Sequence, residues 1–338
     1  MGHNRVRPAA IGVLYALLAA VLIGAPAYSA TIPPHSIVVY DDSWDEPALT
    51  SAAASPLASL PDYITIVDLA FVRPDLVYPG QLDLSHTGLE YRFTGNVLRD
   101  AIAMLKARRP DAKVLVSVGG AAYRNWRALN ETAVAKLVHD LGADGADIDF
   151  EPSHPDCGTS TSGSRYCATD PVWPMLVQRF RTVLPRPAIL TAAVWSVGAY
   201  GEGVFKDAEP SSHYTGLMLR FLRSPVAAEL DMLSIDAYDA GPEFDPTQAF
   251  RAYRAVWAGP LALGLAVARR GGSGPFYSEA DAELLARQVS RDPEGAMMVY
   301  PLLAEPEGAR SDTLPNGRGL ASSICRGMGL RGCATTEP

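Results

Sequence analysis

The residues DGADIDFE, at positions 144–151, decide the fold and most of the chemistry of this chain. Three acidic residues in this stretch alternate strictly, at Asp147, Asp149 and Glu151, with one apolar residue between each pair. Alternation with a period of two predicts a β-strand that carries the carboxylates on one face and the apolar side chains on the other. Carboxylates held so close together raise one another's pKa, and such a shift is typical of a site that donates a proton. Glu151, at the carboxyl end of the row, is the predicted proton donor.

Two non-catalytic interpretations of this stretch are weaker. A solvated sheet face is disfavoured because Gly145, Ala146, Ile148 and Phe150 make the strand too apolar for an exposed edge. A calcium-binding loop is disfavoured because the EF-hand spacing and its central glycine are missing after Asp149. Acid–base chemistry is therefore the favoured role.

The stretch resembles the DxxDxDxE signature of the family 18 glycoside hydrolases, the chitinase family. Two further motifs stand in the matching order: SVGG (117–120) resembles the SxGG of the family's third barrel strand, and AYDAG (237–241) resembles the Tyr-Asp pair that ends the sixth. The resemblance spans roughly residues 36–300. It implies a (β/α)8 barrel that acts on glycans containing N-acetylglucosamine.

The resemblance also implies a role for each residue of the site. Glu151 is the general acid that protonates the leaving oxygen, and the substrate's own 2-acetamido oxygen is the nucleophile, so that the anomeric configuration is retained. Asp149 is expected to orient the acetamide and to stabilise the oxazolinium-like intermediate. Asp147 is expected to hydrogen-bond Asp149 and share a proton with it, and Tyr238 to hydrogen-bond the acetamido carbonyl.

Two positions depart from the family's pattern. Asp236 stands where the family usually has Met or Gln, and Tyr300 stands where it usually has a Trp beneath the reacting sugar. Asp236 adds a negative charge that faces the site, where it can raise neighbouring pKa values or contact a hydroxyl or amino group. A glycan containing N-acetylglucosamine is therefore a firmer expectation than plain chitin.

The rest of the chain alternates short apolar runs with amphipathic ones, as parallel α/β sheets do. Strands are expected at 36–40, 64–71, 113–118, 143–150, 188–194, 232–238, 261–267 and 295–300, and helices at 95–106, 132–141, 172–184, 247–256 and 278–288. Eight strands with crossovers favour a single-domain (β/α)8 TIM barrel over an open doubly wound sheet. No GxGxxG or phosphate loop is present, so no nucleotide cofactor is expected.

The spacing of the last two strands bears on the shape of the cleft. Only about 27 residues separate them. By resemblance, family members with a deep cleft carry a small α+β domain there, and this chain has no room for it. An open cleft and cutting within chains (endo action) are expected.

The active site of such a barrel lies at the carboxyl ends of its strands. The residues expected there are aromatic and acidic, a mixture that suits the faces and hydroxyls of sugars. The candidate substrate-binding residues are Tyr40, Trp44, Trp195, Asp236, Asp239 and Tyr300. For any single aromatic among them, a core position and a sugar platform remain equally open.

The first 29 residues predict a cleaved signal peptide, because a positively charged start is followed by an Ala- and Leu-rich run and a small-residue cleavage site. A retained membrane anchor is the alternative, but Gly24 and Pro26 interrupt the run and no positive stop follows. Cleavage of these 29 of the 338 residues leaves a hydrolase domain of 309 residues, at 30–338. That domain is expected to be secreted, extracellular or periplasmic, with no membrane association after cleavage.

The composition limits the partners and the metals. The net charge is −8 and no dense Lys/Arg run occurs, which disfavours nucleic acid and anionic membranes and suits an uncharged polysaccharide. A monomer is expected. Four cysteines in an exported chain predict two disulfides; of the three possible pairings, the local one, Cys157–Cys167 with Cys325–Cys333, is favoured. No CxxC or Cys/His cluster is present, so no metal site is expected.

Three functions remain open at this stage. The leading one is a secreted, retaining endo-hydrolase of β-1,4-linked N-acetylglucosamine. The second is an endo-β-N-acetylglucosaminidase acting on other acetamido glycans, for which the same residues would serve. The third is a non-catalytic carbohydrate-binding protein on the same scaffold, disfavoured because such relatives typically lose an acid of the signature, whereas all are present here.

Overall fold

The computed structural model describes residues 1–2, 32–308 and 311–333, so the predicted signal peptide lies outside the described residues except for its first two. Parallel strands form the centre of the molecule: β1 (Ile37–Asp42), β2 (Ile66–Val72), β3 (Lys113–Gly119), β4 (Gly145–Asp149), β7 (Ile189–Trp195), β8 (Met232–Asp236), β9 (Leu261–Ala266) and β10 (Gly295–Tyr300). They close into a barrel in the order β1-β10-β9-β8-β7-β4-β3-β2. The predicted (β/α)8 TIM barrel is confirmed.

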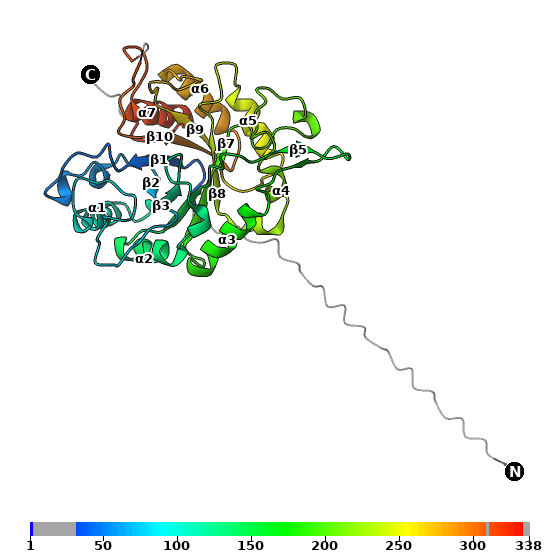
Figure 1. Ribbon diagram of the computed structural model, residues 1–338, viewed down its shortest axis with the longest axis horizontal. Helices are drawn as coiled ribbons and strands as arrows, with labels where there is room; N and C mark the ends of the chain where they lie inside the picture. Colours follow the sequence, from blue (N-terminus) through cyan, green and yellow to red (C-terminus); the bar gives the residue numbers. More distant parts are fainter. Residues whose placement is uncertain (3–31, 309–310, 334–338) are drawn as a thin grey trace.

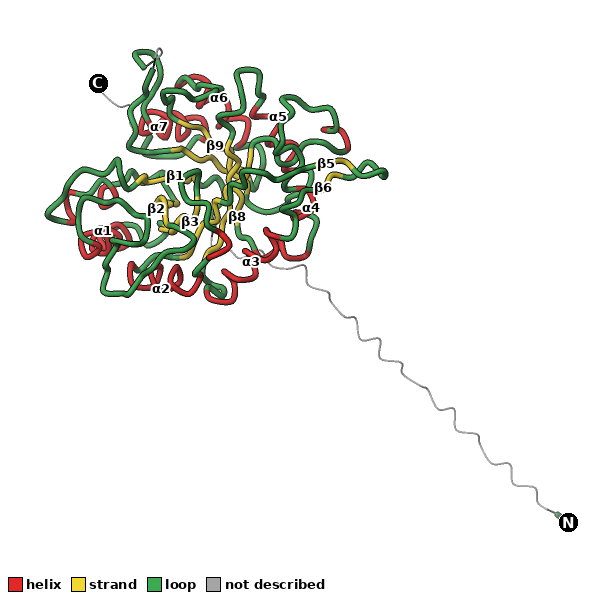
Figure 2. The backbone as a smooth tube through the Cα atoms, in the orientation of Figure 1, coloured by secondary structure: helices red, strands yellow, loops and turns green. Residues whose placement is uncertain are grey.

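Helices surround the barrel, as Figures 1 and 2 show. They are α1 (Gly95–Arg108), α2 (Glu131–Leu141), α3 (Val172–Val183), α4 (Leu219–Leu222), α5 (Pro246–Arg254), α6 (Glu279–Val289) and α7 (Gly317–Met328). The five predicted helices correspond to α1, α2, α3, α5 and α6, with ends within two residues. The sequence did not predict α7, because five of its twelve residues are glycine or serine, which have low helix propensity.

The segment between the last two barrel strands contains α6 and no additional domain. All of its residues, 267–294, are described. The predicted absence of the small α+β insertion is therefore confirmed.

The inside of the barrel is built in layers that follow from strand alternation. Apolar side chains fill the lower part of the barrel interior: Val38, Ile66, Leu115, Ile189, Met232, Ala262, Ala296 and Met298. In the next layer, β-sheet register places Ser117 and Thr191 on either side of Asp147. One layer higher, Asp149 lies beside Gly119. The polar residues therefore collect at the carboxyl end of the barrel, above a packed apolar floor.

Gly119, in the SVGG motif, is required by the close approach of β4. Its φ is +115°, and a Cβ added to it would lie 2.1 Å from the carbonyl oxygen of Asp149 and 2.5 Å from the Trp126 ring. A side chain at this position would push the Asp149 strand away from β3. The motif therefore positions the acidic strand without touching a ligand itself.

A hairpin and two disulfides complete the fold. The hairpin strands β5 (Gly158–Thr159) and β6 (Arg165–Tyr166) form a separate two-stranded sheet, which extends away from the barrel near α4 and α5 in Figure 1. Disulfides join Cys157 to Cys167 and Cys325 to Cys333, so the favoured local pairing is confirmed. Within the described residues, no helix combines the length and apolar character needed to cross a bilayer.

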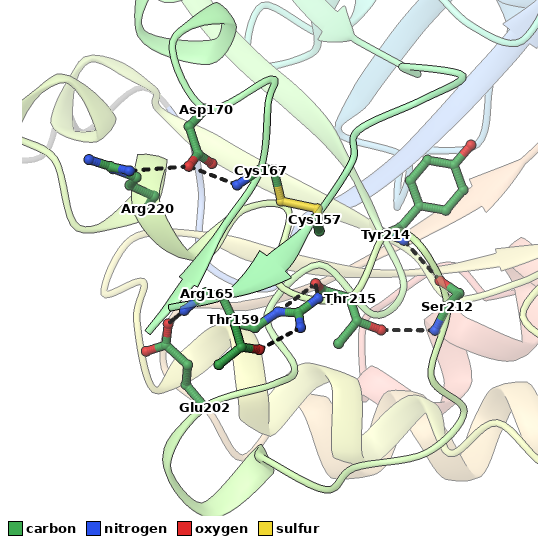
Figure 3. The surroundings of a disulfide bond; sticks show 10 residues. All are labelled: Cys157, Thr159, Arg165, Cys167, Asp170, Glu202, Ser212, Tyr214, Thr215 and Arg220. Carbon is green, nitrogen blue, oxygen red and sulfur yellow. Dashed lines mark hydrogen bonds and ion pairs between the residues drawn. A yellow bond between two sulfur atoms is a disulfide. The ribbon is translucent and has the colours of Figure 1, made fainter. Parts of the chain in front are cut away.

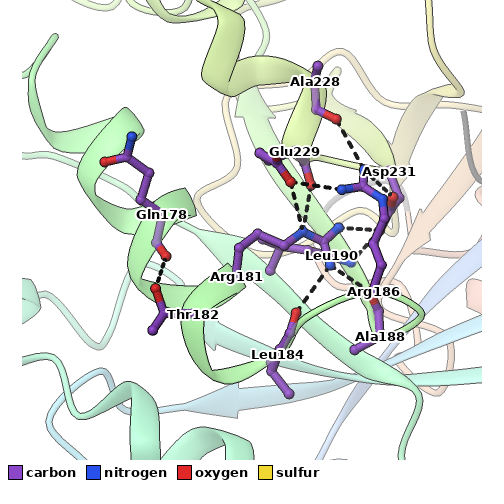
Figure 4. A network of polar contacts seen from close by, with 10 residues as sticks. All are labelled: Gln178, Arg181, Thr182, Leu184, Arg186, Ala188, Leu190, Ala228, Glu229 and Asp231. Carbon is purple, nitrogen blue, oxygen red and sulfur yellow. Dashed lines mark hydrogen bonds and ion pairs between the residues drawn. The ribbon is translucent and has the colours of Figure 1, made fainter. Parts of the chain in front are cut away.

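A buried ion-pair network holds the amino-terminal end of the barrel together (Figure 4). The Asp231 carboxylate accepts hydrogen bonds from Arg181 at 2.5 Å, from Arg186 at 3.0 Å and from the backbone N–H of Leu190 at 2.9 Å. The side chains of Asp231 and Arg181 are only 4% and 8% exposed. This network ties α3 to the starts of β7 and β8, far from the polar end of the barrel.

We expect Asp231→Ala to destabilise the fold by about 3–5 kcal/mol, because the buried Arg181 guanidinium loses its close counter-ion and keeps the more distant Glu229 carboxylate, at 3.9 Å. Urea denaturation of both proteins measures the difference. Asp100→Ala is the control. Both side chains of the Arg99–Asp100 pair are exposed, so the pair should contribute at most about 1 kcal/mol to the stability of the fold. Equal stabilities for the two variants would show that the network contributes nothing beyond a surface pair.

Candidate active site

The Asp147 carboxylate lies inside the barrel, fully buried, and is held by three hydroxyls. Thr191 donates to it at 2.6 Å, Ser117 at 2.8 Å and Tyr40 at 3.0 Å. Burial raises the pKa of Asp147, and these three hydrogen bonds oppose that shift. The expected hydrogen bond from Asp147 to Asp149 is not among its contacts; the hydroxyls take that place because strand register sets two of them beside it.

A further buried acid, Asp68, lies on β2 beside Tyr40 in the register. It is 2% exposed, and its Oδ1 has no hydrogen-bond partner in the described residues. Burial, and then the nearby charge of Asp147, raise the pKa of Asp68 well above its usual value. Both effects favour the protonated form of Asp68.

Three acids occupy the upper end of the barrel. Burial raises the pKa of Asp149, and the charges of Glu151 and Asp236 raise it further. The pKa of Asp236 is raised by burial and by Glu151. The pKa of Glu151 is raised by burial, against the opposing charges of Arg124 and Arg269. The three groups cannot all be ionised together near neutral pH, so the site carries protons that it can donate.

These three acids line a cavity of about 110 Å³ at the mouth of the barrel. Its lining is aromatic and acidic, with one cation: Tyr40, Phe71, Ala121, Asp149, Glu151, Trp195, Asp236, Tyr238, Asp239, Arg269 and Tyr300. The structure thus brings eight of the ten predicted site residues to one cavity. Of the other two, Asp147 lies beneath it, and Trp44 lines the neighbouring cavity.

The two departures from the family pattern lie together. The Tyr238 hydroxyl donates to Asp236 at 3.0 Å, so Asp236 sets its orientation. The Tyr238 and Tyr300 rings stack, with centroids 5.7 Å apart and planes 13° apart, and the edge of Tyr300 meets Tyr40. Tyr300 therefore continues the aromatic surface of the cavity where the family usually has a Trp.

Asp239 and Arg269 form an ion pair at the rim. The Arg269 guanidinium donates to the Asp239 carboxylate and also lies over the Tyr300 ring, 5.6 Å from its centroid. Asp239 accepts a second hydrogen bond from the backbone N–H of Ser273 at 3.1 Å. Asp239 thus holds Arg269 against the cavity.

A second aromatic ring, that of Tyr214, packs on the ring of Trp195. Trp195 and Tyr214 stack, with centroids 3.6 Å apart and planes 11° apart. The pKa of Tyr214 is raised by burial and by the charge of Glu151, which places this tyrosine near the acid. The pair makes a flat apolar wall that suits the face of a sugar.

The disulfide-linked hairpin supports that wall (Figure 3). Arg165, on β6, donates to the carbonyl of Thr215 at 2.5 and 3.1 Å and to the Thr159 hydroxyl at 3.0 Å. Its backbone N–H donates to Glu202 at 2.5 Å. The hairpin therefore holds the segment that carries Tyr214 in place.

Several residues of the site were missed from sequence. Asp68 could have been found, because it is the lone charge in the otherwise apolar strand IVDLAFV. Phe71 could not, because a register shift between Leu69 and Val72 interrupts the alternation that would have assigned its face. Tyr214 and Arg269 lie in loops with no periodic pattern.

The described residues hold no group of three or more His, Cys, Asp or Glu side chains able to bind a metal ion. The acids instead form a graded row, from the buried Asp147 to the partly exposed Glu151. Such a row can deliver a proton to a bound ligand and take it back.

The comparisons with known proteins agree with this geometry. No protein-family model matches the sequence. The chain is 28% identical over 232 residues to exochitinase 1 of Streptomyces olivaceoviridis, a match that covers 63% of this chain and 37% of that protein. The chain thus spans well under half the length of the curated relatives that it matches.

Solved structures resemble the whole barrel. A GH18 chitinase from Pseudoalteromonas aurantia matches with a TM-score of 0.59 and 20% identity, over 86% of this chain and 99% of that one. A GH18 chitinase from Cycas revoluta, solved in complex with (GlcNAc)3, matches with a TM-score of 0.55 and 13% identity, over 86% and 99% of the two chains. At these identities the likeness is one of fold.

Proposed function

We propose that this chain belongs to the family 18 glycoside hydrolases and that it cleaves glycans containing β-1,4-linked N-acetylglucosamine by a retaining, substrate-assisted reaction. The observation that carries the proposal is the row of acids that ends in Glu151 at the cavity mouth, with Asp149 inside the same cavity. The relatives named chitinase, one of them solved with an N-acetylglucosamine trimer, support the choice of substrate.

Glu151 acts as the general acid in this proposal. Its pKa is raised by burial, which favours the protonated form that a general acid needs in order to donate to the leaving oxygen. Once ionised, the same carboxylate can remove a proton from the water that completes the reaction. One residue thus serves both proton transfers.

Asp149 acts on the sugar's acetamido group. The acetamido oxygen attacks the anomeric carbon, and the positive charge that develops on the ring it forms is stabilised by the neighbouring carboxylate. Because this nucleophile belongs to the substrate, it is positioned without a separate binding step. Asp147, held by three hydroxyls, fixes the strand and adds a charge beneath Asp149.

Tyr238 and Asp236 position the other side of the acetamide. The Tyr238 hydroxyl already points into the cavity region through its bond to Asp236. We propose that this hydroxyl turns to the acetamido oxygen when the sugar binds. Asp236, whose pKa is raised well above normal by burial and by Glu151, is then protonated and does not repel the other acids.

The open cleft supports endo action, because no added domain covers it between β9 and β10. Secretion is supported by the two disulfides, which form in oxidising compartments. We propose that the secreted form begins near residue 30 and works as a monomer.

Incubation of the secreted form with chitin oligomers, N-glycans and peptidoglycan fragments tests the proposal. Product masses identify the bond that is cut. We expect cleavage of the chitin oligomers at internal bonds. Cleavage of N-glycan cores alone would favour the endo-β-N-acetylglucosaminidase function, and binding of sugar without any cleavage would favour a carbohydrate-binding protein.

The pH dependence offers a separate prediction through Arg124. Glu151 must be protonated to donate, so kcat falls as the pH rises through its pKa. The charge of Arg124 lowers that pKa, and Arg124→Gln removes this charge. The pKa of Glu151 should therefore rise, and the alkaline limb of the kcat profile should move to higher pH.

The control for this test is Arg127→Gln, the same charge change at an exposed residue three positions along. Its alkaline limb should stay at the wild-type pH. The shift in Arg124→Gln should also shrink in high salt, which screens exposed charges. If the alkaline limb of the kcat profile moved to lower pH in Arg124→Gln, this result would contradict the role of Glu151 as the proton donor.

A further inference from the structure

A second cavity, of about 210 Å³, adjoins the catalytic one. Arg269 and Tyr300 line both cavities, so the two form neighbouring compartments of one cleft. The Tyr300 ring stacks on the Tyr238 ring of the catalytic cavity, while its hydroxyl hydrogen-bonds Asp42 in the second cavity. A glycan bound across the catalytic cavity can therefore extend a neighbouring sugar into the second one.

The second cavity has the platform that a sugar ring needs. Trp44 lines it and is partly exposed. Its ring packs 6.2 Å from the ring of Phe71, which lines the catalytic cavity. The two compartments thus share a continuous aromatic wall.

The polar lining of this cavity is unusual because it is acidic. Four carboxylates line it: Asp42, Asp45, Glu305 and Glu307. The one cation in the lining, Arg269, already donates to Asp239. Arg92 lies close by and donates to the Trp44 carbonyl at 3.3 Å, and its charge lowers the pKa of Asp45.

Three of these acids have at least one carboxylate oxygen without a hydrogen-bond partner among the described residues. Asp42 is 2% exposed, and its Oδ1 has no hydrogen-bond donor. The side chains of Asp45 and Glu307 have no hydrogen bond or ion pair within the described part of the chain, and Glu307 raises the pKa of Asp45. Glu305 differs, since it accepts from Asn316 at 3.0 Å. A neutral sugar could donate hydroxyl hydrogen bonds to these carboxylates, but it would leave their negative charges without a counter-charge.

We propose that this cavity, lined by Trp44, Asp42, Asp45 and Glu307, binds a glucosamine residue whose free amino group is protonated. The proposal rests on the function given above, and it specifies the substrate as a partly deacetylated chitin chain. The reacting sugar keeps its acetamide, because that group is the nucleophile, and the adjoining sugar carries an ammonium group for the acids. An ammonium suits these dispersed carboxylates, which do not converge as the ligands of a metal ion must.

The test compares chitin oligomers of one length, fully acetylated or with a single glucosamine at each position in turn. Wild-type enzyme should show a kcat/KM roughly three- to tenfold higher for one glucosamine position, the size expected of one or two partly exposed ion pairs. That position should lie at a fixed distance from the cleaved bond. The preference should weaken in 1 M salt.

In the variant Asp45→Asn/Glu307→Gln, the ratio of kcat/KM for that glucosamine oligomer to kcat/KM for the fully acetylated one should fall to about one, because the two charges that attract the ammonium are removed. The control is Asp111→Asn/Glu294→Gln, which makes the same charge change at exposed residues beside the amino-terminal ends of β3 and β10. It should keep the preference. Equal preference in wild type and the Asp45/Glu307 variant, or no preference in wild type, would overturn the inference while the cleavage itself upholds the proposed function.

Binding separates the two proposals if no oligomer is cleaved. Absence of all cleavage refutes the proposed function. Calorimetry with the same oligomers still tests whether the second cavity binds glucosamine. Tighter binding of the glucosamine-containing oligomer to the wild type, lost in the Asp45/Glu307 variant, would support that proposal. Equal binding of both oligomers overturns it.

Discussion

Replacing Glu151 by Gln should reduce kcat on a chitin oligomer by roughly 10²- to 10⁴-fold, the range that a general acid contributes. The amide has nearly the same shape as the carboxyl, but it cannot donate a proton to the leaving oxygen. The side chain lies in the cavity lining, so the variant should still bind the oligomer. Steady-state kinetics and calorimetry on the same preparation measure both quantities.

The control for this variant is Glu294→Gln, at an exposed residue beside the amino-terminal end of β10. It makes the same chemical change at the opposite end of the barrel and should leave kcat unaltered. Full activity in Glu151→Gln would mean that another group donates the proton. Loss of binding together with loss of turnover would mean that Glu151 holds the substrate instead.

Replacing Asp149 by Asn should reduce kcat by roughly 10²- to 10³-fold, as expected for the loss of one preorganised electrostatic contact to a developing charge. A thiazoline that mimics the cyclised intermediate should inhibit the wild type competitively. It should bind the variant roughly tenfold to a hundredfold more weakly, because a charge-assisted hydrogen bond is lost. Inhibition constants for the two proteins measure this effect.

Asp144 supplies the matched control, since it is the first acid of the same signature. It lies below β4, where it accepts from the backbone N–H of Val114 at 2.8 Å and pairs with Lys106. Asp144→Asn should lower stability and leave thiazoline binding intact. Equal thiazoline affinity in wild type and Asp149→Asn would remove Asp149 from the proposed mechanism.

The sequence was sufficient for the barrel because its strands are regular. The strict alternation of β4 assigned Asp147 and Asp149 to the inside and Ile148 to the outside, and the structure has them so. Residues at strand ends, such as Tyr238 and Tyr300, could be placed at one rim because parallel strands all end on the same side. This rule, together with the acidic motif and the family resemblance, accounts for the eight predicted residues that line the cavity.

The remaining features depend on three-dimensional packing that no local pattern encodes. Trp44 follows β1 and was predicted to bind substrate beside the other rim residues, and it lines the adjoining cavity. Arg269 and Tyr214 reach the site from loops. The hydrogen bonds of Asp147 come from residues on three other strands, and only the register between strands reveals them.

The main cause of the raised carboxylate pKa values differs from the one expected from the sequence. Repulsion between neighbouring carboxylates was the expected cause of the raised pKa values. Burial is the larger cause for Asp149, Glu151 and Asp236, and like charges come second for Asp149 and Asp236. Burial depends on the closed barrel and on the loops above it, so the sequence spacing alone could not rank the two.

Time-resolved proton NMR of a chitin oligomer during hydrolysis tests the central claim most directly. If the acetamido oxygen attacks first and water second, two inversions occur and the β-anomer of the new reducing end appears before mutarotation. We expect the β-anomer first. Initial formation of the α-anomer would mean a single direct attack by water, and would contradict the proposed roles of both Glu151 and Asp149.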